Sequence, residues 1–288
     1  TDCLPAGEEL EISVLVRNIE KQDGAVNVPL LINDQVAETQ SIQLPAEGTA
    51  RVRFKRKLQP GRYAIRAGQT PALPLTVYPH DPINIAAAEL LEYCSATAKP
   101  CAFTVDRKKN HFVLQASGTD FMHGEDSYGT VYFKKPVKGN FVATVKLIAF
   151  GERTNPWFRA GLFVRNDLRK SFDTGNASLG SVLWFVTPGR VGMNWDRYGD
   201  GAMHWASSEN HPKMEPYPMW LKLVRHGNRF SGFVSYDGVQ WTISRQTEEI
   251  PGVAEAVHLG LAAGSCDEKS YKVEFEDFQV SVEKEGWK

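Results

Sequence analysis

Short runs in which apolar and polar residues alternate dominate this chain. In residues 8–18, Leu10, Ile12 and Val14 fall on one side of a predicted strand and polar residues fall on the other. The same alternation continues through residues 41–58, where proline and glycine at positions 45–48 mark a turn. Because successive side chains of a strand point to opposite faces, the pattern predicts a small β-sandwich over residues 8–78.

Residues 101–288 repeat this character on a larger scale. Strand-like runs such as FVATVKL, SVLWFV and MWLKLV alternate with the turn signals TPG, HGN and YDG. The run AGLFVRND, Ala160–Asp167, is apolar on both faces, as a central strand covered on both sides would be. We therefore predict one large antiparallel sandwich in this part of the chain.

The boundary between the two predicted sandwiches lies near His80. Three prolines, Pro74, Pro79 and Pro82, suggest a short, stiff linker there, which gives one domain over residues 1–80 and a second over residues 81–288. Only the segment INIAAAELLEYC, residues 83–94, has helical spacing, and we expect one or two helical turns in it.

Particular motifs carry a resemblance to two families. Residues 44–49 (LPAEGT) and 60–66 (PGRYAIR) resemble CARDB-type immunoglobulin-like domains, which implies a spacer or adhesion module. The second half resembles the concanavalin A-like superfamily of the DUF1349 type. That resemblance rests on GTDFM, the pair Tyr128–Gly129, AGLFVRND, residues 220–241 and the closing FEDFQV. Together, the two resemblances imply an all-β protein, with a small immunoglobulin-like β-sandwich followed by a large concanavalin A-like jelly-roll sandwich.

Composition excludes some functions and leaves the compartment to be inferred. The chain has Lys+Arg 33 and Asp+Glu 34, so it lacks the basic excess of a nucleic-acid binder. It also contains no run of about 18 apolar residues, the length that a membrane-spanning helix needs. Cys94 and Cys101 bracket a short loop and form either a disulfide or two free thiols. We expect a secreted, periplasmic or cell-surface protein, which leaves room for further domains of a longer chain.

Catalytic signatures are weak. Jelly-roll glycosidases need paired carboxylates, and the same-face acidic string that would supply them on one strand is absent. We therefore expect no catalytic residue, and favour a non-catalytic carbohydrate-binding or adhesion module of a polysaccharide-processing protein. The alternative is a glycoside hydrolase or polysaccharide lyase with an unrecognised site in the groove. Two acids, or a histidine and a tyrosine, converging there would favour it.

The segment from Val191 to Trp220 holds the candidate site. Aromatic rings on polar, glycine-punctuated loops can stack on a sugar, and nearby amide, carboxylate and imidazole groups can bind its hydroxyls. The predicted glycan-binding residues are Trp195, Tyr198, Trp205, His204, Asn194 and Asp196. The alternative is that some of these rings fill the sandwich core. We expect Trp195 and Tyr198 to be exposed and Trp220 to be buried.

The resemblance also implies a cation. Concanavalin A-like domains often carry a structural Ca²⁺, and Asp173, Asp196 and Asp200 lie in predicted loops as candidate ligands. We expect no other cofactor, and a polysaccharide or glycan as the partner.

Overall fold

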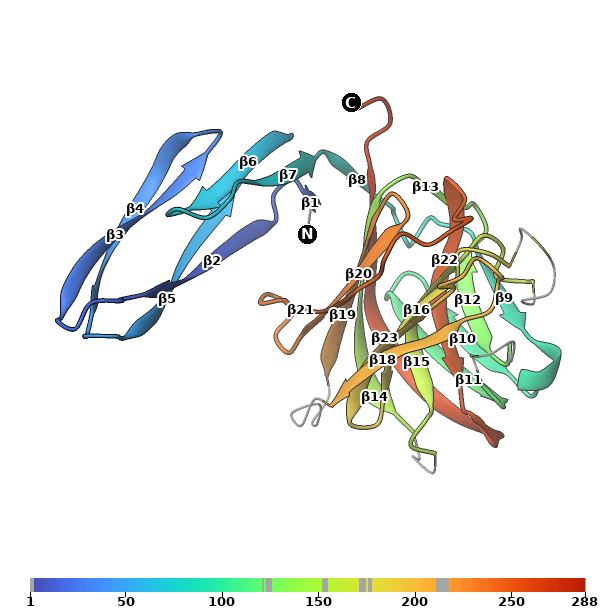
Figure 1. Cartoon of the computed structure of the whole chain (residues 1–288). Helices are drawn as coiled ribbons and strands as arrows, with labels where there is room; N and C mark the ends of the chain where they lie inside the picture. The colour runs from blue at the N-terminus through green and yellow to red at the C-terminus, as the bar shows by residue number, and fades with distance from the viewer. Residues whose placement is uncertain are drawn as a thin grey trace. The chain divides into compact units, whose positions relative to one another are not determined.

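The protein is built from strands that form two compact units. The computed structural model describes residues 3–120, 122, 126–151, 155–170, 175, 178–210 and 218–287. One unit comprises Thr1–His80 with Glu283–Lys288, and the other comprises Asp81–Val282 (Figure 1). Within the described ranges the structure contains no α-helix, which confirms the all-β prediction. No helix in the described part of the chain is long and apolar enough to cross a membrane.

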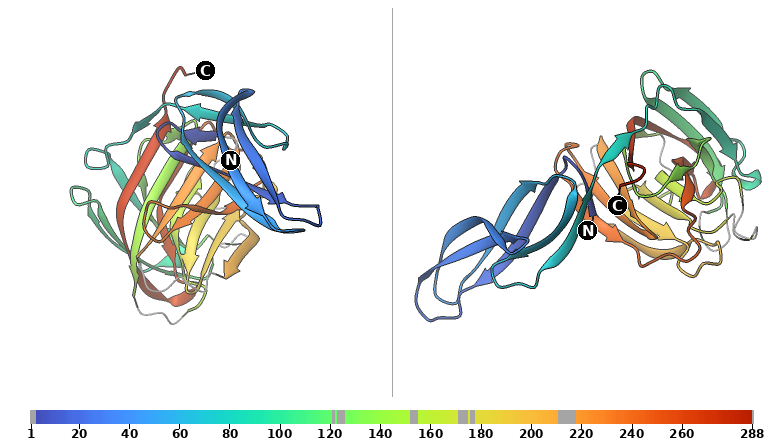
Figure 2. Two further views of the ribbon diagram at one scale, coloured as in Figure 1. Left: turned by 90° about the vertical axis from the view of Figure 1, so that its left-hand side faces the viewer. Right: turned by 90° about the horizontal axis from the view of Figure 1, so that it is seen from above.

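The small unit is a β-sandwich of two sheets. Its strands are β1 (Cys3–Pro5), β2 (Glu9–Arg17), β3 (Gly24–Ile32), β4 (Gln35–Leu44), β5 (Thr49–Lys57), β6 (Gly61–Ala67) and β7 (Leu73–Tyr78). One sheet has the order β1–β7–β6–β3–β4, and β2 pairs with β5 in the other (Figure 2). Side chains from both sheets, among them Leu30, Phe54 and Val77, form its core. On β2, Leu10, Ile12 and Val14 pack against this core, as their alternation predicts.

The large unit consists of two large sheets. The strands before its midpoint are β8 (His80–Pro82), β9 (Leu90–Cys94), β10 (Ala102–Asp106), β11 (His111–Gly118), β12 (Gly129–Phe133), β13 (Val137–Lys138), β14 (Phe141–Phe150) and β15 (Arg159–Arg165). The later strands are β16 (Val182–Thr187), β17 (Arg190–Trp195), β18 (His204–Asn210), β19 (Met219–His226), β20 (Arg229–Ser235), β21 (Thr242–Gln246), β22 (Ala256–Gly264) and β23 (Asp267–Glu283).

The strand order defines a jelly-roll sandwich. The sheet that we call the β14 sheet has the order β10–β11–β23–β14–β19–β20–β21, with β8 paired to β23. The β15 sheet has the order β18–β17–β16–β15–β22–β12–β9, with β13 paired to β22. Each sheet also joins strands from distant parts of the sequence: β23 lies between β11 and β14 in the β14 sheet, and β22 lies between β15 and β12 in the β15 sheet. The large unit is therefore a sandwich of two large sheets.

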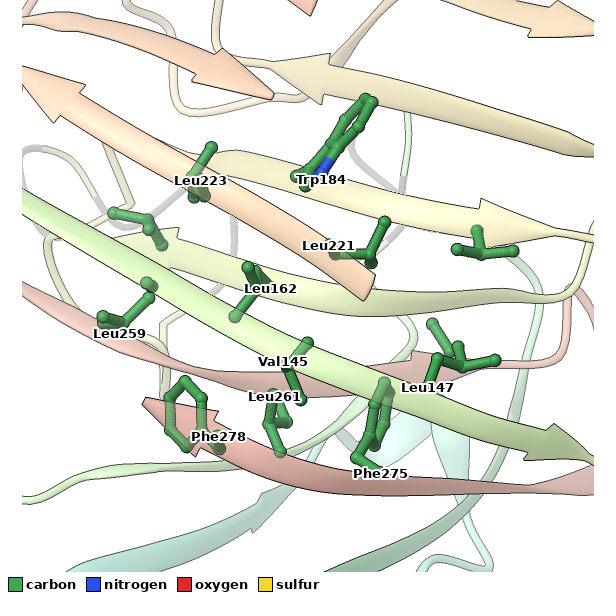
Figure 3. Close-up of a cluster of buried hydrophobic side chains, with 14 of the residues drawn as sticks. Val145, Leu147, Leu162, Trp184, Leu221, Leu223, Leu259, Leu261, Phe275 and Phe278 are labelled. Atoms are coloured by element: carbon green, nitrogen blue, oxygen red, sulfur yellow. The ribbon is translucent and has the colours of Figure 1, made fainter. Parts of the chain in front are cut away.

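The core of the large unit lies between these two sheets. Figure 3 shows Leu221 and Phe275 of the β14 sheet, and Leu162, Trp184 and Leu261 of the β15 sheet, within one cluster of buried side chains. Every residue of β15 is buried, which confirms the sequence prediction of a central strand covered on both faces. The face of β15 that points away from this core is therefore also covered by other side chains. That face is described below with the candidate site.

The predicted helix at residues 83–94 is wrong. Residues 85–88 form a turn, in which the Ala88 N–H donates to the Asn84 carbonyl at 2.9 Å. Leu90–Cys94 then forms β9, which pairs antiparallel with β12. The pairing with β12 supplies hydrogen bonds that a short isolated helix could not match. Cys94 and Cys101 form a disulfide with a Cα–Cα distance of 6.0 Å, one of the two alternatives that their spacing left open.

Trp220 is half-buried rather than buried. On β19, Met219 and Leu221 point into the core, so the intervening Trp220 lies on the other face of the β14 sheet. Its indole lies where a Cβ on Gly238 would come within 3.1 Å. Gly238 has φ +73°, and its N–H donates to Ser235 Oγ at 2.9 Å, so the turn predicted from YDG, residues 236–238, is present.

Candidate binding site at the β17–β18 connection

Strand β17 divides the predicted site residues between its two faces. Val191, Met193 and Trp195 point into the core, and Trp195 is 4% exposed. The expectation that Trp195 is exposed is therefore wrong. Its polar neighbours in sequence do not surround it, because adjacent side chains of a strand point to opposite faces. Trp195 contributes to the core and offers no face to a ligand.

Asn194 lies on the face of the β15 sheet that points away from this core, which we call the outer face. It stands opposite Leu183 of β16, a member of a second buried cluster. Asn194 is fully buried, yet neither Oδ1 nor Nδ2 has a hydrogen-bond partner. A buried polar group without a partner destabilises a protein by about 1–3 kcal/mol. Such a group indicates a place where water or a ligand binds.

The second cluster covers the outer face. Its members are Tyr128, Tyr132, Phe163, Leu168, Leu183, Phe185, Met203 and Ala262. Three of them, Tyr128, Leu168 and Met203, come from connections between strands and belong to the same buried cluster as the side chains of the sheet. This face is therefore packed, and the groups accessible to a ligand lie at its rim, where the β17–β18 connection begins.

Asp196 organises that connection. Its own N–H donates to the Ser181 carbonyl at 2.9 Å, which continues the β16–β17 pairing by one residue. The buried carboxylate accepts N–H groups of Gly199 (2.8 Å), Asp200 (3.1 Å) and Gly201 (3.1 Å). Burial raises the pKa of the Asp196 carboxyl above its ordinary value, against the effect of these donors. Asp196, a predicted ligand residue, thus stabilises the turn through hydrogen bonds to its backbone N–H groups.

Two exposed residues of the connection, Tyr198 and Asp200, lie near His204, the partly buried first residue of β18, and we call these three the rim group. Tyr198 is 67% exposed, as expected from the sequence. Its ring meets the His204 ring edge-on, with centroids 4.5 Å apart. His204 Nε2 lies 3.6 Å from Asp200 Oδ2. The rim group therefore combines an accessible aromatic face with a carboxylate and an imidazole.

Two predicted residues cannot be placed in full. Trp205 pairs with Asn194 through the backbone of β18, and its side chain lies outside the described part of the structure. Asp173 lies outside the described residues altogether. Among the side chains that the structure describes, Tyr198 is the exposed ring of the predicted sugar platform, with His204 beside it and Asp200 next to His204.

Arg165 fills the neighbouring row of the outer face as a structural residue. It is fully buried, and its Nη2 donates to Asp126 Oδ1 at 2.8 Å. Its Nε donates to Ser181 Oγ at 2.6 Å, and its Nη1 donates to Tyr128 Oη at 3.2 Å. Since all three guanidinium nitrogens have partners, Arg165 ties the segment around Asp126 to the sheet and is not free to bind a ligand.

A histidine and a tyrosine also meet on the outer face. The rings of His258 and Tyr132 lie 5.0 Å apart, and His258 Nδ1 is 3.3 Å from Asp167 Oδ1. The Leu168 N–H donates to the same Nδ1 at 3.3 Å. Burial lowers the pKa of His258, which is 7% exposed, while Tyr132 is 1% exposed. The sequence shows no sign of this pair, because the two residues lie on strands far apart in the chain.

A family model matches most of the large unit. The family is described as "Protein of unknown function (DUF1349)", and the match covers residues 97–282. The chain belongs to the DUF1349 family. The β17–β18 connection and the outer face both lie inside the matched range, so the candidate site is part of the DUF1349 domain. No relative with a curated description matches the sequence.

Several solved structures match this chain at low identity. A functionally unknown protein from Saccharomyces cerevisiae is 16% identical with a TM-score of 0.52, over 69% of this chain and 98% of that chain. A seed lectin from Lotus tetragonolobus is 11% identical with a TM-score of 0.44, over 71% and 100%. The GH43 protein BlXynB from Bacillus licheniformis is 13% identical with a TM-score of 0.48, over 81% and 47%. Only the first exceeds 0.5, and it shows the fold alone.

The structure brings two of the three predicted calcium ligands together. One ligand atom each from Asp196, Asp200 and His204 lies within 4.8 Å of the others. Calcium takes about six to eight oxygen ligands, and the imidazole of His204 is a nitrogen donor that calcium disfavours. Asp173 lies outside the described residues, so the calcium site stays a prediction.

Proposed function

We propose that the large unit binds carbohydrate without modifying it, through the rim group of Tyr198, Asp200 and His204. The observation that carries the proposal is the exposed Tyr198 ring, held edge-on against His204 beside a carboxylate. An aromatic ring offers a flat apolar face to the C–H groups of a sugar. The carboxylate accepts, and the imidazole donates or accepts, hydrogen bonds from hydroxyl groups.

The finer proposal concerns the context of the chain. The small unit would be a CARDB-type spacer that positions the DUF1349 domain on a polysaccharide. The Cys94–Cys101 disulfide supports a secreted, periplasmic or cell-surface location, because disulfides persist in oxidising compartments. The protein would then be one part of a polysaccharide-processing system, with adhesion as the same activity directed at a cell surface.

A second candidate function is polysaccharide cleavage on the outer face. The pairing of His258 with Tyr132, and the orientation of His258 by Asp167, favour it. The burial of both rings opposes it, because a substrate would first have to displace Leu168 and Met203. We therefore rank it below binding.

Binding is tested by a glycan array and by pull-down with insoluble polysaccharides. Tyr198→Ala should reduce binding at least about tenfold and change stability by less than about 0.5 kcal/mol, because the side chain is exposed. The matched control is Tyr236→Ala, since Tyr236 is 46% exposed on the same unit. Equal binding by Tyr198→Ala and the unmodified protein would refute the rim site. New reducing or unsaturated ends in the polysaccharide would instead favour the enzyme, and His258→Gln should abolish them.

A further inference from the structure

Three potential metal ligands converge at the β17–β18 connection. One ligand atom each from Asp196, Asp200 and His204 lies within 4.8 Å of the others. The three residues are four apart in sequence, and the turn that brings them together is fixed by N–H donation to Asp196 from Gly199 and Gly201. A metal ion could therefore bind without refolding of the connection.

Charge at this place is not balanced by the protein. Asp196 is fully buried, and no lysine or arginine in the described part of the chain forms an ion pair with it. The nearest arginine in sequence, Arg197, pairs with Glu248 at 3.4 Å instead. A buried carboxylate with only N–H donors is costly, because the charged form has lost its water. A bound cation would compensate for this loss.

A second and independent observation points to a ligand here. Asn194 precedes Asp196 by two residues, so its side chain points to the same outer face, about 7 Å away along the strand. Its amide is fully buried, and both polar atoms lack partners. An ion with its bound water at this position would give the Asn194 amide the partner that the protein does not provide.

The chemistry of the donors selects the class of ion. Two carboxylates and one imidazole form a mixed oxygen and nitrogen set, whereas calcium and magnesium prefer oxygen alone. Three protein ligands with a fourth position for water are a common arrangement for zinc. We propose that Asp196, Asp200 and His204 bind a divalent transition-metal ion of the zinc type. The metal site shares Asp200 and His204 with the rim group, but it is argued from the ligand geometry and does not require that the protein bind a glycan.

The test measures metal binding directly, with no glycan present. Tag-free full-length protein is stripped with a chelator, dialysed and titrated calorimetrically with Zn²⁺, Mn²⁺ and Ca²⁺ in parallel. We expect one zinc ion per chain, with zinc bound at least about tenfold more tightly than calcium. Zinc should also raise the Tm of the stripped protein.

Variants separate this site from others. His204→Ala and Asp200→Asn should each weaken zinc binding at least about tenfold, since even indirect partners of metal ligands contribute that much. His226→Ala, a histidine on β19, is the matched control and should bind zinc as the unmodified protein does. Tyr198→Ala should keep its zinc while losing glycan. No zinc binding, binding unaffected by both ligand variants, or a preference for calcium would overturn the site.

Discussion

The two faces of the β15 sheet are made by the same strands and stabilised in different ways. The core face is apolar, with Leu162, Trp184 and Leu261 packed against the β14 sheet (Figure 3). The outer face is also buried, but polar groups lie among its aromatic rings. These are the Arg165–Asp126 ion pair, the imidazole of His258, and the amide of Asn194, which has no partner. Burial alone therefore does not define the role of a residue here.

This difference indicates where stability and function reside. On the core face, a side chain contributes through the area that it removes from water. On the outer face, each polar group contributes only as far as its partners are present. Arg165 has its partners and Asn194 does not, so one face of one sheet contains both satisfied and unsatisfied polar groups.

Removal of a core-face ring should have the largest effect. Trp195→Ala should lower the free energy of unfolding by about 3–5 kcal/mol, because it leaves a cavity in the core. Trp157→Ala is the matched control, since Trp157 is 43% exposed and should cost about 1 kcal/mol or less. Urea unfolding of both variants measures the difference. Equal losses would show that Trp195 is not part of the core.

Removal of a satisfied charge from the outer face should have the next largest effect. Arg165→Met should destabilise the protein by about 3 kcal/mol, because it leaves Asp126 largely buried and unpaired. Arg169→Met breaks the Arg169–Asp167 pair, in which Arg169 is 54% exposed, and should cost less than about 1 kcal/mol. Adding Asp126→Asn to Arg165→Met should recover part of the loss in urea unfolding. A double variant as unstable as the sum of both would contradict this account.

Removal of the unpartnered amide should have the opposite sign. Asn194→Leu replaces two unsatisfied polar atoms with a side chain of similar size, and should stabilise the metal-free protein by about 1 kcal/mol. The control is Asn140→Leu, because the Asn140 Oδ1 accepts the Gly227 N–H at 2.7 Å and its loss should destabilise. Thermal unfolding of both variants decides the matter. Destabilisation by Asn194→Leu would show that its amide has a partner in solution.

The smallest effect concerns pH. Burial lowers the pKa of His258 from its ordinary value of 6.5, so the unfolded chain binds this proton more readily than the folded one. The contribution of His258 to stability is therefore present above about pH 6.5 and is lost as the pH falls toward the folded pKa. His258→Gln should lose less stability between about pH 7 and pH 5 than the unmodified protein. Identical pH profiles would show that His258 titrates normally.

Some structural features were readable from local sequence. Alternation predicted the strands, and a run that is apolar on both faces predicted that β15 is buried on both sides. The same alternation is present at Val191, Met193 and Trp195, and it predicts that Trp195 is in the core. The expectation that Trp195 is exposed followed its polar neighbours instead. The helical spacing of residues 83–94 predicted a helix that does not form, because residues 90–94 pair with β12 as strand β9 instead.

The sequence by itself determined the strand content and the exposure of Tyr198 on its polar turn. It also named the Cys94–Cys101 disulfide as one of two alternatives. These depend on residues close together in the chain. Only the tertiary structure decided that Asn194 is buried without a partner and that Arg165 pairs with Asp126. Partners of this kind come from strands distant in sequence, and strand order across two large sheets is not encoded in any local pattern.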